Sequence, residues 1–112
     1  MRYAVRIAAI AALFAGSAIA LPGFGAAQDE VVVGYSAPGL VGAQLEIQQG
    51  LIDHAEEKGW EVLTVTSGGD AQKQIDDINN YIAQQVDAIV AVPDDSAGIC
   101  TAVAAAQEAE IP

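Results

Sequence analysis

The sequence predicts a three-layer α/β fold with a parallel sheet between helices, and two observations carry this prediction. Three short runs rich in valine or isoleucine, VVVGYS, EVLTVT and DAIVAV, occupy residues 31–36, 61–66 and 87–92. A stretch with helical spacing of apolar residues follows each run. Near-continuous apolar runs are typical of strands that are buried on both faces of a parallel sheet. The expected order is therefore β-α-β-α-β-α.

The first helix is expected over residues 41–58. Its apolar face is expected to carry Ile47, Leu51, Ile52 and Ala55. Gly59 is a suitable C-terminal cap, because glycine adopts the left-handed conformation that often ends a helix. We expect Trp60, which follows this glycine, to pack against the helix end rather than to stack on a ligand.

The second helix is expected over residues 71–85, with Asp70 as its N-cap. Its apolar positions are Ala71, Ile75, Ile78 and Ile82. The third helix is expected over residues 97–109. Its apolar stripe is expected to contain Ile99, Cys100, Val103 and either Ala106 or Gln107, with Cys100 as a small core residue.

Strand–helix–strand units of this length form parallel pairs with right-handed crossovers. We therefore expect the strand order 2-1-3, which is the opening half of a doubly wound sheet. Such sheets bind ligands beyond the carboxyl ends of the strands, where the strand order reverses. Here the reversal lies between the first and third strands, so the loops at residues 36–42 and 93–98 are expected to face one crevice.

Both loops contain candidate ligand-binding residues. Those on the first loop are Ser36, Ala37 and Pro38, and those on the second are Asp94, Asp95 and Ser96. A carboxylate can accept two hydroxyl hydrogen bonds, which suits a sugar or polyol. Aspartate and serine are also favoured helix N-caps. Capping and ligand binding stay open as alternatives, and the two roles can coexist in one loop.

Other chemistry has less support in the sequence. The segment GYSAPGLVG lacks both the G-x-G-x-x-G spacing and the G-K-[ST] ending of phosphate-binding loops. Adjacent carboxylates such as Asp94 and Asp95 rarely flank a glycosidic bond as an acid–base pair. His54 has no second histidine or nearby cysteine, so we expect a surface residue rather than a metal ligand or a catalytic base. We expect no catalytic residue, metal or cofactor, and a buried Tyr35.

The N-terminus has the layout of a secretory signal peptide. Arg2 and Arg6 precede the apolar run IAAIAALFAGSAIAL, and small residues follow Pro22. The apolar run is shorter than the roughly 20 residues that a membrane-spanning helix needs. We therefore expect residues 1–27 to be a signal peptide that is cleaved after Ala27, and the protein to have no stable membrane anchor.

The remaining residues, 28–112, are strongly acidic. Two lysines against 15 acidic residues give a net charge of −13. Such a surface repels phosphate backbones and anionic lipids, so nucleic acid and membrane partners are not expected. A single cysteine rules out an internal disulfide framework.

Two stretches carry a resemblance to a known family. One is QGLIDHAEEKGWEV, with Gly50 inside the first helix and Gly59 at its end. The other is SGGDAQKQIDDINNYIAQQVDAIVAVPDDSAG, which contains a P-x-D-S loop at Pro93, Asp95 and Ser96. In these stretches the chain resembles the sugar-type periplasmic substrate-binding proteins of ABC transporters, the ribose- and galactose-binding group. The resemblance implies the opening half of the N-terminal lobe of a type I periplasmic binding protein.

The chain departs from the family pattern at two places. Family members have an Asn-Pro-aromatic-aromatic segment after the first strand, whereas Ala43 and Gln44 occupy the aromatic positions here. The resemblance places Gln44 at the ligand, and the missing aromatics favour a small polyol, a furanose or a non-sugar ligand over a stacked pyranose. Glu110 replaces a glycine that is common before Ile-Pro.

The resemblance implies an exported, periplasmic protein that captures a small polar ligand, a sugar or polyol, for the membrane permease of an ABC transporter. One alternative is a ligand-binding component for a chemoreceptor or sensor kinase. Another, of a different class, is an exported Rossmann-like enzyme. Family members are two-lobed clamps, and this chain ends where a fourth strand is expected to begin. We therefore expect residues 28–112 to be a partial N-terminal lobe within a longer protein.

Overall fold

The computed structural model describes residues 29–112. The signal peptide expected at residues 1–27 lies outside the described residues. The elements alternate in the expected order: β1 (Val32–Ala37), α1 (Ala43–Lys58), β2 (Glu61–Thr66), α2 (Ala71–Ala83), β3 (Ala88–Ala91) and α3 (Cys100–Glu108). In residues 29–112 no helix is both long and apolar enough to cross a membrane.

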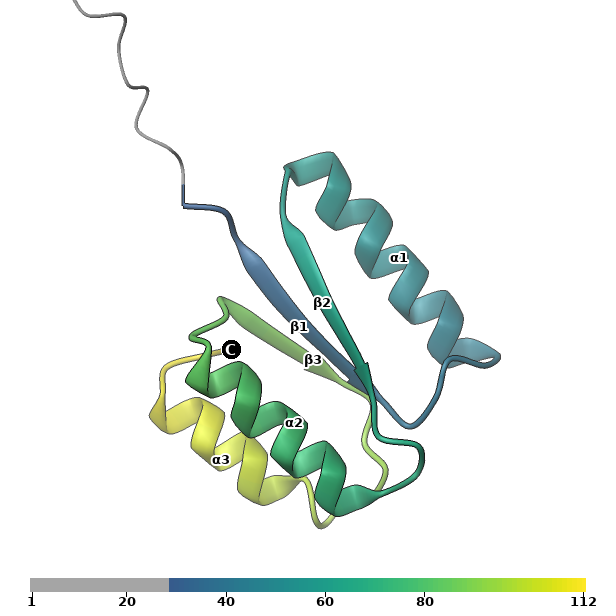
Figure 1. Cartoon of the computed structure of the whole chain (residues 1–112), viewed down its shortest axis with the longest axis vertical. Helices are drawn as coiled ribbons and strands as arrows, with labels where there is room; N and C mark the ends of the chain where they lie inside the picture. Colours follow the sequence, from purple (N-terminus) through teal and green to yellow (C-terminus); the bar gives the residue numbers. More distant parts are fainter. Residues whose placement is uncertain (1–28) are drawn as a thin grey trace, which may run out of the picture.

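The three strands form one parallel sheet in the order β2-β1-β3, which confirms the predicted fold class and strand order. Val33 of β1 lies opposite Val62 of β2 on one side and Ala88 of β3 on the other. Helix α1 covers one face of the sheet, whereas α2 and α3 lie together on the other face (Figure 1). The carboxyl ends of all three strands therefore point to the same edge.

The central strand β1 is buried on both faces. Side chains alternate along a strand, so Val33 and Tyr35 face α1, and Gly34 and Ser36 face α2. The Tyr35 hydroxyl donates a hydrogen bond of 2.9 Å to the carbonyl oxygen of Gln44 in α1. On the opposite face, a Cβ atom added to Gly34 would lie 2.6 Å from the ring of Tyr81. The glycine is needed there because the tyrosine ring packs directly on the strand.

Helix α2 packs on the sheet through Gln74, Ile78 and Tyr81, all of which are buried. Asp70 caps its N-terminus as predicted, since its carboxylate accepts a 3.0 Å hydrogen bond from the backbone N–H of Lys73. Of the predicted apolar positions, Ile78 is buried, whereas Ala71, Ile75 and Ile82 are only half-buried. The buried stripe therefore contains Gln74 and Tyr81 where the prediction had the neighbouring residues Ile75 and Ile82. Both of these buried side chains carry a polar group.

The predicted face of α1 is wrong at Ile47. This side chain is 47 % exposed, whereas the neighbouring Gln48 is only 7 % exposed. Successive residues are 100° apart around a helix, so the stripe that meets the sheet runs through Gln48, Ile52 and Ala55, and Ile47 lies beside it. The packing of Ala55 was predicted correctly, and it is buried.

The predicted stripe of α3 is also wrong at Cys100, which is exposed. Val103 is 46 % exposed, whereas Ala102 and Ala106 are buried. The helix begins at Cys100, three residues later than expected, and small alanine side chains make its close contact. Almost every position of CTAVAAAQE is small or apolar, so the sequence alone does not define which side of this helix packs.

Left-handed backbone marks the ends of all three helices of the described residues, at Gly59 after α1, Gln85 after α2 and Glu110 after α3. Gly59 ends α1 with a φ of 71°, and the N–H of Trp60 donates to the carbonyl of Ala55 at 2.8 Å, which confirms the predicted cap. Glu110 has a φ of 58°. This is the position where the resembling family has glycine, which adopts such a conformation without strain. Beyond it, Pro112 accepts a 2.8 Å hydrogen bond from the N–H of Ile89 at the outer edge of β3.

Candidate functional site

The end of β1 and the residues that follow the three strands are tied together by backbone hydrogen bonds, and we call this region the carboxyl edge (residues 36–38, 67–68 and 92–96). The N–H of Val92 donates to the carbonyl of Ser36 at 2.9 Å. The N–H of Ser67 donates to the carbonyl of Ala37 at 3.0 Å, and that of Gly68 donates to Pro38 at 3.0 Å. The end of β1 and the residue after β3 therefore lie side by side, as the strand order predicts, and the loop after β1 is bonded to the loop after β2.

Gln74 connects this edge to helix α2. Its side-chain amide donates to the carbonyl of Val92 at 2.8 Å and to the hydroxyl of Ser36 at 3.3 Å. Its side-chain oxygen accepts a 2.8 Å hydrogen bond from the N–H of Asp94. The residue is only 1 % exposed. A single buried side chain therefore holds the end of β1 and the loop after β3 together.

The two adjacent aspartates of this loop have different partners. The carboxylate of Asp94 accepts a hydrogen bond from the Ser67 hydroxyl, which comes from the loop after β2. The carboxylate of Asp95 accepts from the N–H of Ala97 at 3.3 Å and of Gly98 at 2.8 Å. Asp94 is thus directed into the edge, whereas Asp95 satisfies backbone donors ahead of α3 in the manner of a cap.

The predicted site residues differ in exposure. Ser36 and Ala37 are 0 % exposed. Pro38, Gln44 and Asp94 are half-buried, and Asp95 and Ser96 are exposed. The structure brings Ser36, Ala37, Pro38 and Asp94 into one hydrogen-bonded region, with Ser36 and Ala37 beneath its surface. Gln44 lies in the first turn of α1, and its backbone is held by Tyr35.

Sequence reasoning missed the roles of Ser67 and Gln74. A signal for Gln74 was present, because it has helical spacing with two other buried residues, Ile78 and Tyr81. Ile75 and Ile82, which are half-buried, also have helical spacing, and they led to the prediction of the neighbouring face. Ser67 carried no comparable signal, since a serine after a strand is an ordinary turn residue.

The aromatic side chains of the described residues are buried or lie at the other end of the strands. Tyr35 is fully buried, and burial raises the pKa of its hydroxyl. The Tyr81 hydroxyl lies 2.9 Å from the carbonyl oxygen of Tyr35 and 3.0 Å from that of Leu63. Burial, together with the nearby carboxylate of Asp77, raises the pKa of Tyr81 to about 12. Trp60 precedes β2 and so lies at the opposite end of the strands.

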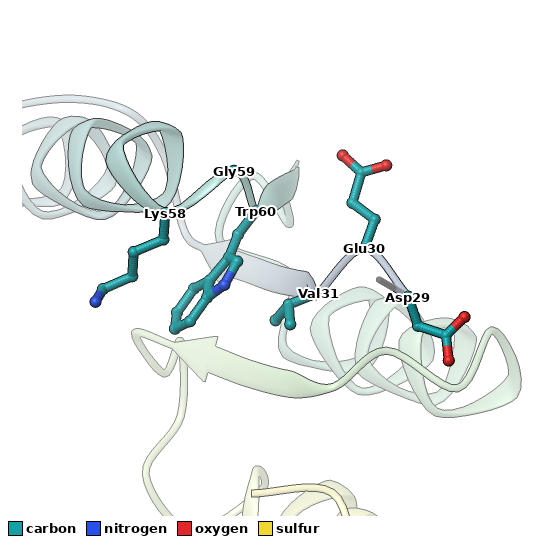
Figure 2. Close-up of a pocket in the computed structure, with 6 residues that line it drawn as sticks. All are labelled: Asp29, Glu30, Val31, Lys58, Gly59 and Trp60. Atoms are coloured by element: carbon teal, nitrogen blue, oxygen red, sulfur yellow. The ribbon is translucent and has the colours of Figure 1, made fainter. Parts of the chain in front are cut away.

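A hollow also lies at that opposite end, which we call the amino edge. It has a volume of about 690 Å³ and is lined by Asp29, Glu30, Val31, Lys58, Gly59 and Trp60. The Lys58 ammonium lies 5.4 Å from the centre of the Trp60 ring. Figure 2 shows the carboxylates of Asp29 and Glu30 pointing away from Trp60. These side chains do not converge on a common point, so their polar groups do not form a binding site.

A second, mostly apolar hollow of about 370 Å³ lies between α2, β3 and α3, with Ile78, Ile89 and Val103 in its lining. Neither hollow contains the predicted site. His54 is exposed and lies 3.5 Å from Glu57, as expected of a surface histidine. Within residues 29–112, no group of three or more histidine, cysteine or acidic side chains is arranged to hold a metal ion.

The electrostatics of the carboxyl edge are acidic. Asp94 and Asp95 lie on it, and Asp70 follows the loop after β2. The nearest lysine is Lys73, whose ammonium binds the carboxylate of Asp77 at 2.6 Å and the carbonyl of Thr66 at 3.0 Å. Lys58, the other lysine of the described residues, lies at the amino edge. An anionic ligand would meet net repulsion at the carboxyl edge.

Comparison with known proteins decides the family. Residues 33–112 match the model of the periplasmic binding protein domain. The chain belongs to this family. Members of the family bind solutes and are not enzymes, so the alternative of an exported Rossmann-like enzyme is set aside. The resemblance of the chain to the sugar-type group is likewise confirmed by a curated relative, the ribose import binding protein of Bacillus subtilis (strain 168).

That relative is 34 % identical over 68 residues, which are 61 % of this chain and 22 % of the relative. A solute-binding protein from Bacillus halodurans with bound myo-inositol superposes with a TM-score of 0.68 at 25 % identity, over 74 % of this chain and 29 % of that one. The arabinose-binding protein from Shewanella sp. ANA-3, bound to L-arabinofuranose, gives a TM-score of 0.65 at 26 % identity, over 73 % and 28 %. The chain therefore spans less than a third of the length of these relatives.

Proposed function

We propose that this chain forms part of the ligand-binding lobe of an exported solute-binding protein, which captures a small neutral polyhydroxylated ligand for import by an ABC transporter. The observation that carries the proposal is the family match over residues 33–112. The proposed whole protein has a signal peptide at residues 1–27, a periplasmic location and a membrane permease as its partner. Residues 28–112 are the opening part of its N-terminal lobe.

The proposed site is the carboxyl edge, at the reversal of strand order between β1 and β3. Surface for ligand contact comes from Pro38, Gln44, Asp94, Asp95 and Ser96. Ser36 and Ala37 support the site from below, because both are fully buried. Of the two carboxylates, that of Asp95 is the more exposed, so it is the proposed acceptor for ligand hydroxyl groups.

Two features support a neutral ligand that is not stacked on an aromatic ring. The carboxyl edge is acidic, which opposes sugar phosphates and sugar acids. The aromatic rings of the described residues are buried or lie at the amino edge, so this part of the lobe presents no stacking surface. Solved relatives with bound myo-inositol and with bound L-arabinofuranose support a polyol or furanose as the ligand class.

Binding of a defined ligand panel to the full-length protein tests this function. The panel contains D-ribose, L-arabinose and myo-inositol, with D-ribose 5-phosphate as the anionic probe, and calorimetry measures each Kd. We expect micromolar or tighter binding of a neutral member and no binding of the phosphate. Binding of only the phosphate, or of no neutral sugar or polyol in a wider panel, would contradict the proposal.

The site itself is tested with Asp95. Asp95→Ala is expected to raise Kd more than tenfold, because a hydrogen bond to a charged group contributes about 1.5–3 kcal/mol. Asp95→Asn keeps a side-chain oxygen that can accept the N–H of Gly98, but it removes the negative charge. This variant therefore separates loss of the helix cap from loss of the charged contact with the ligand. His54→Ala, a change on the exposed side of α1, is the control and is expected to leave Kd unchanged. Equal Kd values for wild type and Asp95→Ala would reduce Asp95 to a helix cap.

A further inference from the structure

The position of the Pro93–Ser96 loop depends on side chains outside the loop. Asp94 is held at two points: Gln74 of α2 accepts its backbone N–H at 2.8 Å, and the hydroxyl of Ser67 donates to its carboxylate. Gln74 also donates to the carbonyl of Val92, just before the loop. Asp95, the proposed ligand acceptor, is the next residue along the chain. Any movement of the Asp94 backbone therefore moves the Asp95 carboxylate.

We propose that Gln74, together with Ser67, is a positioning residue for ligand binding. It fixes the loop after β3 against the end of β1 without touching the ligand. This proposal rests on the proposed function, because it names which buried residues hold that site in its binding geometry. The basis of the proposal is that the side-chain amide of Gln74, which is only 1 % exposed, makes three hydrogen bonds at the carboxyl edge. Its N–H groups donate to the Ser36 hydroxyl and the Val92 carbonyl, and its oxygen accepts from the Asp94 N–H.

Glutamine suits this role because of its two kinds of polar group. The carbonyl of Val92 needs a donor and the N–H of Asp94 needs an acceptor, and a side-chain amide supplies both from one rigid plane. Methionine has a similar length and shape but supplies neither. Gln74→Met therefore leaves the partly buried backbone groups of Val92 and Asp94 without these partners, which frees the loop to move while the apolar contacts of α2 persist.

A matched control exists on the opposite face of the sheet. Gln48 of α1 is also buried, at 7 % exposure, and it lies away from the loop after β3. Gln48→Met makes the same chemical change in a helix of the same domain. Ser67→Ala is the second test variant, because it removes the hydroxyl partner of Asp94 from the loop after β2. Ser67 is buried, at 4 % exposure, but the change removes a single oxygen atom and leaves the apolar contacts of α2 in place.

The first measurement is amide hydrogen exchange in the full-length, ligand-free protein, followed by NMR. In Gln74→Met the N–H of Asp94 is expected to exchange at least tenfold faster than in wild type. The N–H of Val92 donates to the carbonyl of Ser36 within the sheet, not to Gln74, and its exchange is expected to stay unchanged. Equal acceleration at both amides would show general destabilisation of the variant. No acceleration at Asp94 would show that Gln74 does not hold the loop. Either result overturns the proposal.

The second measurement is affinity for the panel member among D-ribose, L-arabinose and myo-inositol that wild type binds most tightly. Gln74→Met is expected to raise Kd at least tenfold and Ser67→Ala at least threefold, with Gln48→Met within twofold of wild type. Unchanged Kd in the folded Gln74 and Ser67 variants refutes the positioning role. If wild type binds none of the three, the tightest-binding neutral sugar or polyol of the wider panel takes their place. If no member of that panel binds, the proposed function fails, and the exchange of Asp94 in Gln74→Met or Ser67→Ala still decides whether these residues hold the loop.

Discussion

The two faces of the sheet are packed by different means. On the α2 face, side chains meet the central strand at fixed points: the Tyr81 ring lies on Gly34, and Gln74 binds the hydroxyl of Ser36. On the α1 face, the Tyr35 hydroxyl donates to the carbonyl of Gln44, but Leu45 and Ile47 of the helix are 46 % and 47 % exposed, so contact there is looser. We call the α2 side of the sheet the tight face and the α1 side the loose face. The comparison teaches that the tight face is the one that supports the candidate site, because Gln74 reaches the site from α2.

The largest expected effect comes from breaking the tight face at Gly34. Gly34→Ala places a Cβ 2.6 Å from the Tyr81 ring, a distance at which the ring or the strand must move. We expect the free energy of unfolding to fall by about 1–3 kcal/mol, the usual cost of overpacking a core. Urea unfolding of wild type and variant measures the change.

A second variant tests whether the clash with Tyr81 is the cause. Tyr81→Leu in the Gly34→Ala background removes the ring, so the two changes are expected to be non-additive, with the double variant losing less than the sum of the single losses. A loss below about 0.5 kcal/mol for Gly34→Ala would mean that the two faces do not differ as described, since ordinary surface changes have effects of that size.

The strands and their order were predictable because they depend on local patterns. Apolar runs, turn residues and crossover handedness act over short stretches, so the element bounds differ from the predicted ones by at most three residues. The carboxyl edge followed from strand order alone. Gly59 and Asp70 were predictable for the same reason, since helix caps depend on neighbouring residues.

The packed faces of the helices were less predictable, because they depend on partners far along the chain. Four alanines follow Cys100 in α3, so several stripes fit the pattern equally well, and the one with Ala102 and Ala106 is buried. Gln48 is a polar residue in a buried position, which hydrophobic spacing does not reveal. The partner of Gln74 in the candidate site, Asp94, is 20 residues away. Such a contact requires the assembled fold.

A smaller effect is expected from alkaline pH on the tight face. The pKa of Tyr81 is raised from 10.0 to about 12 by burial and by Asp77, so the folded state favours the neutral hydroxyl. A group whose pKa is raised on folding contributes stability below its unfolded pKa and loses it as pH rises through the folded value. The extra stability of wild type over Tyr81→Phe is therefore expected to be constant up to about pH 9 and to shrink between pH 10 and 12.

Urea unfolding of both proteins across this pH range gives the measurement. Taking the difference between them removes the contributions of the lysines and of Tyr35, whose pKa burial also raises and which both proteins retain. A difference that stays constant to pH 12 would show that Tyr81 is open to solvent, and that the contact with Gly34 is looser than described.

The smallest effect, and one of opposite sign, is expected on the loose face. Gly50 lies inside α1, and a Cβ added there would have no atom within 4 Å. Glycine in a helix interior costs about 0.5–1 kcal/mol relative to alanine, because it loses more backbone freedom on folding. Gly50→Ala is therefore expected to raise the free energy of unfolding by about that amount, while the same substitution at Gly34 lowers it. Urea unfolding again provides the measurement. A loss of stability in Gly50→Ala would mean that another part of the full-length protein packs on this side of α1, and the looseness of the α1 face would then belong to residues 29–112 alone.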